Sequence, residues 1–372
     1  MHNKKVLFIA PRFHTNQFFL TKQLLEKGVE VHFLSIYLGG SENHNYIIPI
    51  VSRPSIFIKG LLKKYTASNN HGRSILRKYH ITSFRHCIEI YKKLKPEIVI
   101  IRNINNLFSL QHFIVALLFR KKIFLYTQHN YRGYLGVKRN FFLKFLKFLG
   151  IHHFTPVLGE PNQPYAPNTS YIPFVIDKMN TKKGVLLRMQ QPGIKVITIG
   201  KMVERKKIKE LIQILKEIPQ FNISENEILV VSECISKDNF AYYENLKKEI
   251  TKEGVLVKFY LNIPHQEVLS LLKASDLFIL PSYDEQAAFS ILEAMACGVG
   301  VICSDQNGTK CYIQEGVNGA VFTYSENLDH LKEILKSLLD KKTLVDYGME
   351  SLNQIEAHHG IENFYKTIIV DK

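Results

Sequence analysis

Cysteine is scarce in this sequence, which has five in 372 residues, scattered and never spaced as Cys-x-x-Cys. This argues against a disulfide scaffold and a zinc site, and it predicts a protein of the reducing cytosol. Long apolar runs are also lacking: the longest, 107–119, is interrupted by Gln111 and His112, so we expect no membrane-spanning helix. No signal peptide is expected, because the first residues lead directly into a predicted strand, 6–10. With 46% hydrophobic and 22% charged residues, the composition is globular and excludes low-complexity disorder.

Acidic residues are scarce in one half of the chain only. Residues 1–186 contain 28 Lys and Arg against 7 Asp and Glu, whereas residues 187–372 contain 21 against 26. We interpret this difference as functional, with the first half facing an anionic surface or partner. Segment 137–149, and on a smaller scale segment 56–65, interleaves aromatic and cationic residues as helices at membrane surfaces do. The basic charge also raises nucleic-acid binding as an alternative, although the sequence has no zinc finger, RRM signature or Gly-rich phosphate loop.

Both halves of the sequence have the pattern of alternating strands and helices. Prolines at six positions between 156 and 192 separate them and predict a crossover between domains. The alternation predicts an α/β fold of two Rossmann-like domains, each with a parallel sheet, facing a cleft. The strands that we expect are 5–10, 29–36, 97–102 and 123–129, then 195–199, 228–232, 256–260, 277–280 and 299–303, with helices at 18–27 and 207–218. The predicted division is an N-terminal domain 1–176, a linker 177–192, a C-terminal domain 193–355, and a helix 356–372 that returns to the first domain.

Segment 281–305 is more specific than the rest of the chain. It reads as the end of a buried strand, a loop, a short helix closed by Gly298, and another strand. Two carboxylates stand eight positions apart, Glu285 in the loop and Glu293 on the helix. The start of that helix, near 288–290, offers free backbone N–H groups and the positive end of the helix dipole, which suit a phosphate.

This segment resembles the retaining GT-B glycosyltransferases of family GT4, the glycosyl transferases group 1, whose signature is a Glu-x7-Glu pair. The run Glu-Ala-Met-Ala-Cys-Gly at 293–298 and the glycine turns at 307–308 and 315–319 are similar to the family pattern, as are Gly200-Lys201 and Lys206. The match runs in order over 195–325, whereas the first half is similar mainly in architecture and at 128–130. Departures are Gln286-Ala287 for glycine and an aromatic residue, Gly300 for proline, and Lys201 for arginine.

The resemblance implies a role for each matching residue. Glu293 would hold the ribose hydroxyls of a nucleotide-sugar donor, and Glu285 would contact the donor sugar near its reacting carbon. Lys201 and Lys206 would neutralise the diphosphate. His129 would contact the sugar or the acceptor from the first domain. The implied catalytic residues are Glu285, His129 and Lys206, and the implied donor-binding residues are Gly200, Lys201, Lys206, Glu285, Gln286, Ala287, Ala288, Phe289 and Glu293.

The same residues could instead have purely structural roles. Ser290-x-x-Glu293 is also the spacing of a capping box, so Glu293 could close the helix instead. Glu285 could be a solvated loop carboxylate, Lys201 and Lys206 could belong to a solvated charged face, and His129 could be structural. No spacing of histidine, cysteine and carboxylate residues predicts a metal site.

The implied reaction moves a sugar from a nucleoside diphosphate to an acceptor hydroxyl with retention of configuration, without a cofactor or a metal. The expected acceptor is a lipid-linked or cell-surface glycan precursor, of the lipopolysaccharide or polysaccharide type. The expected location is the cytoplasm, peripheral at the inner, anionic face of the membrane. The alternatives are a GT-B sugar-nucleotide epimerase and, from a different class, the nucleic-acid-binding protein already considered.

Overall fold

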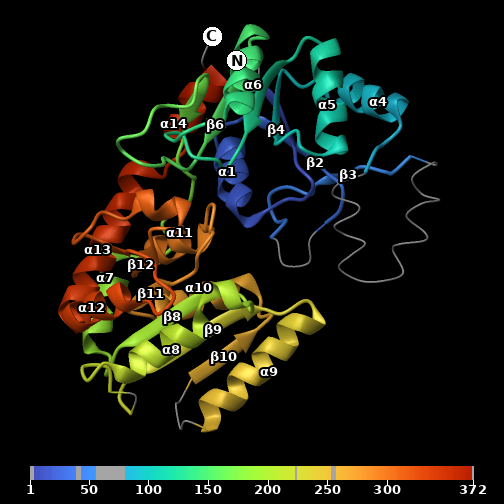
Figure 1. Cartoon of the computed structure of the whole chain (residues 1–372). Helices are drawn as coiled ribbons and strands as arrows, with labels where there is room; N and C mark the ends of the chain where they lie inside the picture. The colour runs from blue at the N-terminus through green and yellow to red at the C-terminus, as the bar shows by residue number, and fades with distance from the viewer. Residues whose placement is uncertain (1–3, 39–42, 56–79, 223, 253–256, 371–372) are drawn as a thin grey trace. The chain divides into compact units, whose positions relative to one another are not determined.

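The computed structural model describes residues 4–38, 43–55, 80–222, 224–252 and 257–370 (Figure 1). The basic segment 56–65, expected at a membrane surface, lies outside these described residues. The chain forms two compact units. The first unit is Met1–Val175 with Ile361–Lys372, and the second unit is Ile176–Gly360. Each holds one parallel sheet with helices on both faces, so the predicted α/β fold of two Rossmann-like domains is confirmed.

The sheet of the first unit has seven strands in the order β3-β2-β1-β4-β5-β6-β7, and every pair is parallel. The strands are β1 (Lys5–Ile9), β2 (Glu30–Ser35), β3 (Ile50–Val51), β4 (Ile98–Arg102), β5 (Lys122–Tyr126), β6 (His152–Thr155) and β7 (Thr169–Tyr171). The order reverses direction at β1 and β4. In open parallel sheets, ligands bind beside the carboxyl ends of the strands at such a switch point.

Helices cover the two faces of this sheet because successive side chains of a strand point to opposite sides. Leu7 and Ile9 lie in one core cluster with residues of α4 (Phe84–Leu94), α5 (Leu107–Leu118) and α6 (Val137–Phe148). Phe8, on the other side, stacks on Phe33 and Phe364. That face carries α1 (Thr15–Glu26), α14 (Glu362–Phe364) and the π-helix η4 (Tyr365–Val370).

The sheet of the second unit has six strands in the order β10-β9-β8-β11-β12-β13, again all parallel. The strands are β8 (Lys195–Lys201), β9 (Glu227–Glu233), β10 (Val257–Leu261), β11 (Leu277–Leu280), β12 (Gly300–Ser304) and β13 (Gly319–Phe322). Here the switch point lies between β8 and β11. Gly200 lies near the end of β8, and β11 leads into the loop that contains Glu285.

Two sets of helices cover the sheet of the second unit. One core cluster joins the strands to α8 (Ile208–Glu217), α9 (Lys237–Lys252) and α12 (Asp329–Leu338). The remaining helices are α7 (Lys182–Leu186), α10 (His265–Lys273), α11 (Phe289–Ala296) and α13 (Lys341–His358), and α11 packs against α13. The described residues of this unit also form the short 3-10 helices η1 (Leu187–Gln190), η2 (Glu204–Lys206) and η3 (Gly308–Tyr312).

The strands predicted from apolar runs are present within two or three residues of the expected bounds. The proline-rich stretch is more ordered than the sequence indicates, because it contains β7, α7 and η1. Val185 of α7 is buried against α13 together with Leu352, and the Arg188 guanidinium donates hydrogen bonds to the carbonyls of Ser275 and Gly298. Residues 177–192, expected as a linker, therefore pack within the second unit.

No helix in the described part of the chain is both long enough and apolar enough to cross a membrane.

Candidate active site

The site begins where β8 ends and the chain turns into α8. η2 and Lys207, whose φ of 52° is left-handed, turn the chain so that the Lys206 side chain lies against Gly200. A Cβ on Gly200 would lie 2.9 Å from Cε and 3.1 Å from Cδ of Lys206. Glycine at position 200 therefore leaves the room that the Lys206 side chain needs.

An ion cluster joins this turn to the loop after β11. The Lys206 Nζ lies 2.6 Å from Oε2 of Glu285, and Nη1 of Arg205 lies 2.7 Å from the same oxygen. Arg205 also donates to the backbone carbonyl of Tyr283, at 3.2 Å. Among the described residues, no hydrogen bond reaches Oε1 of Glu285. Oε2 of Glu285 is thus held by two cations, whereas Oε1 can accept a hydrogen bond from a ligand.

Burial and charge oppose each other within this cluster. Burial alone would raise the pKa of Glu285, but Lys206 and Arg205 outweigh it, so the pKa lies below its ordinary value. Burial lowers the pKa of Lys206 more than Glu285 raises it, because the lysine side chain is only 9% exposed. The carboxylate is therefore firmly ionised, and the buried ammonium depends on it for charge compensation.

Backbone hydrogen bonds fix the position of Glu285. Its N–H donates to the carbonyl of Gln306 at 3.1 Å, and its carbonyl accepts from Gly308 at 2.9 Å. Asn307 caps η3 by accepting from the backbone N–H of Thr309 at 3.0 Å. The glycine turn at 307–308 is therefore the structural support of the Glu285 loop.

Glu293 lies in a separate buried pair. Its Oε1 is 2.6 Å from Nε2 of His265, the first residue of α10. Burial lowers the pKa of His265, but the carboxylate outweighs this effect and the pKa is raised above its ordinary value. The capping-box reading of Glu293 is wrong: the N-cap of α11 is Ala288, and Ser290 lies inside the helix. Glu293 is thus a buried carboxylate fixed by an imidazole.

The start of α11 follows the same loop. Ala288, at the N-cap, makes no side-chain hydrogen bond to the first turn of the helix. Ala288 and Phe289 are buried, whereas Gln286 is exposed and Ala287 is half-buried. Of these four predicted donor-binding residues, Gln286 is the one whose side chain is open to solvent.

Lys201 is not part of the ion cluster. Its side chain is 62% exposed and lies 4.0 Å from Glu233 of β9, so it is held only weakly. Within the predicted set of the second unit, the structure therefore brings Gly200, Lys206 and Glu285 together, while Lys201 and Glu293 are held by other partners.

His129 belongs to the first unit and follows β5. Its ring is exposed, and its backbone carbonyl accepts a hydrogen bond of 2.6 Å from Oγ1 of Thr155. Partial burial and, next, the charge of Arg139 lower its pKa. The loop is therefore fixed through its backbone while the imidazole stays accessible.

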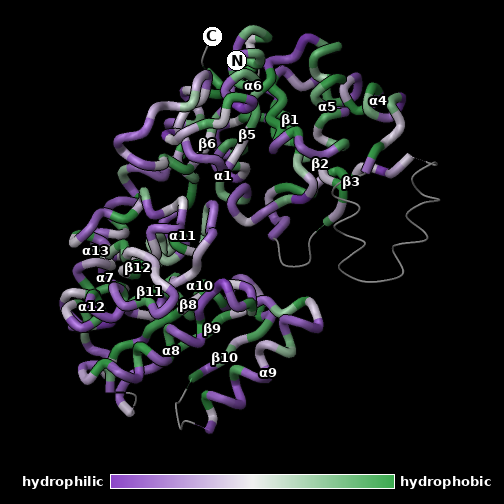
Figure 2. Tube along the Cα trace, viewed as in Figure 1, coloured by the Kyte–Doolittle hydropathy of each residue, from purple (hydrophilic) through white to green (hydrophobic). Residues whose placement is uncertain are grey.

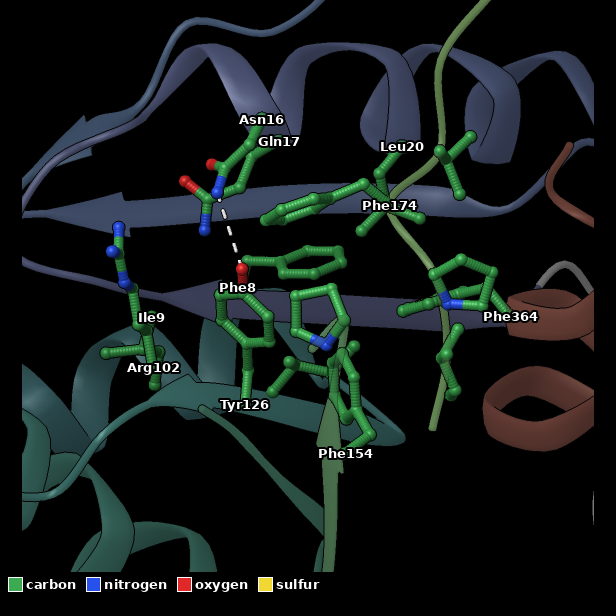
Figure 3. A pocket seen from close by; sticks show the side chains of 15 residues that line it. Phe8, Ile9, Asn16, Gln17, Leu20, Arg102, Tyr126, Phe154, Phe174 and Phe364 are labelled. Atoms are coloured by element: carbon green, nitrogen blue, oxygen red, sulfur yellow. Dashed lines mark hydrogen bonds between the residues drawn. The ribbon is translucent and has the colours of Figure 1, made fainter. Parts of the chain in front are cut away.

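The first unit also contains a hollow of about 30 Å³ beneath the start of α1. Figure 3 shows its mainly apolar walls, with Phe8, Phe154 and Phe364 beside Asn16 and Tyr126. Asn16 Nδ2 donates to Oη of Tyr126 at 3.3 Å, and its buried Oδ1 has no partner. A hollow of this size has room for one or two water molecules. A water there would satisfy Asn16.

Two residues of the site were missed by sequence reasoning. Arg205 lies in the charged run 201–209, from which Lys201 and Lys206 were predicted. Nothing in the spacing of this run indicates that Arg205 contacts Glu285. His265 begins a helix 28 positions before Glu293, and no signal in the sequence links the two. Over the described residues, no group of three or more His, Cys, Asp and Glu side chains is placed to hold a metal ion.

Comparisons with known proteins find similar sequences for part of the chain. Residues 187–355 match the family described as glycosyl transferases group 1. Lipopolysaccharide glucosyltransferase WaaG of Escherichia coli K12 is 26% identical over 160 residues, which are 42% of this chain and 41% of that protein. The UDP-Gal:alpha-D-GlcNAc-diphosphoundecaprenol alpha-1,3-galactosyltransferase of Escherichia coli is also 26% identical, over 46% of this chain and 43% of its own length. The chain thus spans about two fifths of the length of these curated relatives.

Solved structures extend the likeness to the whole fold. A glycosyltransferase from Rickettsia africae aligns over 100% of both chains with a TM-score of 0.69 and 12% identity. HepE of Anabaena, solved with UDP-glucose, aligns over 98% of both chains with a TM-score of 0.65 and 15% identity. WaaG covers 98% of this chain and 100% of its own, with a TM-score of 0.63 and 14% identity. The second unit therefore carries the sequence pattern of glycosyl transferases group 1, on a chain with the GT-B fold.

Proposed function

We propose that this protein is a retaining glycosyltransferase that moves a sugar from a nucleoside-diphosphate sugar to an acceptor hydroxyl. The observation that carries the proposal is the cluster of Lys206, Arg205 and Glu285, at the carboxyl ends of β8 and β11 inside the segment that matches the family. The proposal is supported by HepE, which was solved with UDP and with UDP-glucose.

The donor is held by groups of the second unit. Oε1 of Glu285 accepts a hydroxyl of the donor sugar, because Oε2 is occupied by the two cations. Glu293, oriented by His265, accepts the ribose hydroxyls. The diphosphate lies near the uncapped N–H groups of α11, Lys206 and the more exposed Lys201.

Charge stabilisation drives the transfer. The bond between the anomeric carbon and the phosphate oxygen breaks, and a bond from the acceptor oxygen to the same face of that carbon forms. The acceptor proton passes to the leaving phosphate oxygen. Lys206 and Arg205 stabilise the negative charge that grows on the phosphate, and because they are fixed by Glu285 before the reaction, little reorganisation is needed. This proposal requires no metal or cofactor.

The proposed acceptor is a lipid-linked or cell-surface glycan precursor. Relatives named for lipopolysaccharide and for a diphosphoundecaprenol-linked sugar support it. Such an acceptor places the protein in the cytoplasm at the inner face of the membrane, where the basic first half meets anionic lipid. His129 contacts the sugar or the acceptor.

Binding of nucleotide sugars tests the proposal. UDP-, GDP- and ADP-glucose are added to the full chain and to Glu293→Gln, and the melting temperature is measured. One nucleotide stabilises the wild type by about 2.7 kcal/mol at one hundred times its Kd, and the shift is lost in the variant. Glu356→Gln, a surface carboxylate of the same unit, keeps it. If no nucleotide sugar moves the wild-type melting temperature, the proposed function is wrong.

Product analysis separates retention and epimerisation. The anomeric configuration of the glycosylated product is read by NMR, and an inverted centre contradicts the retaining mechanism. The donor incubated without acceptor is recovered as the same sugar or as its hydrolysis product. Recovery of an epimerised nucleotide sugar would instead identify a sugar-nucleotide epimerase.

A further inference from the structure

Helix α5 of the first unit is apolar on its outward side as well as at the core-facing residues Phe108, Phe113, Val115 and Ala116. Its outward residues are all leucine or isoleucine and are 37 to 66% exposed: Leu107, Leu110, Ile114, Leu117 and Leu118. Its polar side chains point inward and are buried: Ser109, Gln111 and His112. A surface helix of a globular protein normally carries polar and charged residues on its outward side.

Hydrogen bonds inside the unit fix this rotation of α5. Oε1 of Gln111 accepts from the N–H of Thr82 at 3.2 Å, and its Nε2 donates to the Thr82 carbonyl at 2.9 Å. The ring of His112 stacks on Tyr91. Rotating α5 so that this outward row faced the core would break both amide hydrogen bonds and expose the residues that are now buried. The outward row of leucine and isoleucine is therefore built into the fold.

Helix α6 adds aromatic residues on the same face of the sheet. It connects β5 to β6 just as α5 connects β4 to β5, and both helices contribute to one core cluster. Of its apolar residues only Leu143 and Leu146 are buried, whereas Val137, Phe141, Phe145 and Phe148 are 48 to 87% exposed. Figure 2 shows green along most of α5 and green alternating with purple along α6. We call the outward residues of the two helices the α5–α6 surface.

The charge around this surface has one sign. Residues 98–159, which the structure describes throughout, contain nine Lys and Arg and no Asp or Glu. Three of the cations, Arg120 to Lys122, directly follow α5. Four more lie on α6: Lys138, Arg139, Lys144 and Lys147. An apolar surface interleaved with cations matches the boundary between headgroups and acyl chains of an anionic bilayer.

A second copy of the chain fits this surface less well. A symmetric dimer would bring together two faces that each carry these cations and no acidic residue to pair with them. Like charges across an interface disfavour association. A bilayer instead supplies the missing negative charge and hydrocarbon for the leucine and phenylalanine side chains.

We propose that the α5–α6 surface docks the first unit onto an anionic lipid bilayer, with the row of leucine and isoleucine on α5 entering the boundary of the acyl chains. This inference deepens the proposed location of the enzyme at the membrane. It assigns a membrane contact to a helix that the sequence shows only as an apolar run.

Liposome flotation of the full chain tests the surface. The vesicles are phosphatidylglycerol with phosphatidylcholine in equal parts, or phosphatidylcholine alone. We expect the wild type to float only with the anionic vesicles and to be released at high salt. Ile114→Gln with Leu118→Gln lowers the partition coefficient at least tenfold, and Phe141→Ser with Phe148→Ser does the same.

The matched control is Leu186→Gln with Leu187→Gln, two leucines of similar exposure on the second unit, and it floats as the wild type does. Circular dichroism verifies that each variant is folded. The proposal is overturned if the wild type does not float or if the α5 and α6 variants float unchanged. It is also overturned if the wild type is a dimer that the α5 variant makes monomeric, because the occupant is then a second copy. The thermal shift by nucleotide sugars stays unchanged in the α5 variant, so failure of this proposal and failure of the proposed function are told apart.

Discussion

Glu285 compensates two cations with a single carboxylate oxygen, and this makes it harder to replace than either cation. Replacing Lys206 removes one buried charge but leaves Glu285 its contact with Arg205. Replacing Glu285 leaves a buried ammonium beside a guanidinium without an anion. Removing one partner of a buried pair costs more than the pair itself contributes, because the remaining charge stays desolvated.

We therefore predict that Glu285→Gln destabilises the second unit by about 3 kcal/mol and Lys206→Met by about 1 kcal/mol. Urea unfolding, followed by circular dichroism at pH 7, measures both. A larger loss in Lys206→Met than in Glu285→Gln would show that the lysine is not held by the carboxylate as described.

At the scale of single elements, the turn between β8 and α8 depends on the missing side chain of Gly200. Gly200→Ala places a methyl group 2.9 Å from Cε of Lys206, whose ammonium is held by Glu285. We expect the lysine to be displaced from the carboxylate and the shift in melting temperature with nucleotide sugar to fall at least threefold, while the fold is kept.

Gly136→Ala is the matched control, because a Cβ there meets no atom within 4 Å. Isothermal titration of both variants with the nucleotide sugar that stabilises the wild type gives their Kd values. Equal binding by the two would show that the room beside Gly200 is not used.

Prediction from sequence worked best for features that a single helix or strand determines. Buried parallel strands such as β9 and β11 are short apolar runs, and runs of this kind are visible without knowledge of the fold. β7 was missed because it is a three-residue, half-buried strand at the edge of the sheet, with a polar sequence. The helix α11 and its start near 288–290 were predicted correctly, whereas the capping box was not, because Ala288 rather than a polar residue is at the N-cap.

The candidate site was predictable only in part, because some of its contacts are local in the sequence and others join distant segments. The spacing of Glu285 and Glu293 is a local property of loop and helix, so it could be recognised in the sequence. Arg205 and His265 enter through pairs that join distant segments, and these are selected by packing of β8, β11, α10 and α11. The sequence offered many cations and 15 histidines, and nothing local distinguishes the two that make these contacts.

At the scale of the whole molecule, the two units carry histidines whose pKa values are shifted in opposite directions. In the first unit, burial lowers the pKa of His80 to about 4, of His112 to about 3 and of His153 to about 4. These values lie below the ordinary 6.5. Below pH 6.5 the three histidines therefore bind more protons in the unfolded chain than in the folded unit, and acid favours unfolding. In the second unit, the raised pKa of His265 contributes stability that is present below pH 6.5 and lost at higher pH.

We predict that acid destabilises the first unit before the second. Each of the three histidines removes about 2 kcal/mol between pH 7 and pH 5, from a slope of about 1.4 kcal/mol per pH unit below its unfolded pKa. Glu285 does not oppose this difference, because its lowered pKa affects stability only below about pH 4.5. Pulse proteolysis in urea at pH 7 and pH 5, with the fragments identified by mass spectrometry, assigns cleavage to each unit. Equal loss of both units at pH 5 would contradict the prediction.

The core of the first unit includes residues that follow the second unit in the sequence. Phe364 packs on Phe154 and Phe8, and the N–H of Ile361 donates to Oε1 of Gln23 at 3.0 Å. During synthesis on the ribosome, residues 4–175 therefore emerge without part of their own core, and 185 further residues are translated before it arrives. The unit that begins the chain thus completes its core last, and Phe8 and Phe154 lack this packing partner until the second unit has been synthesised.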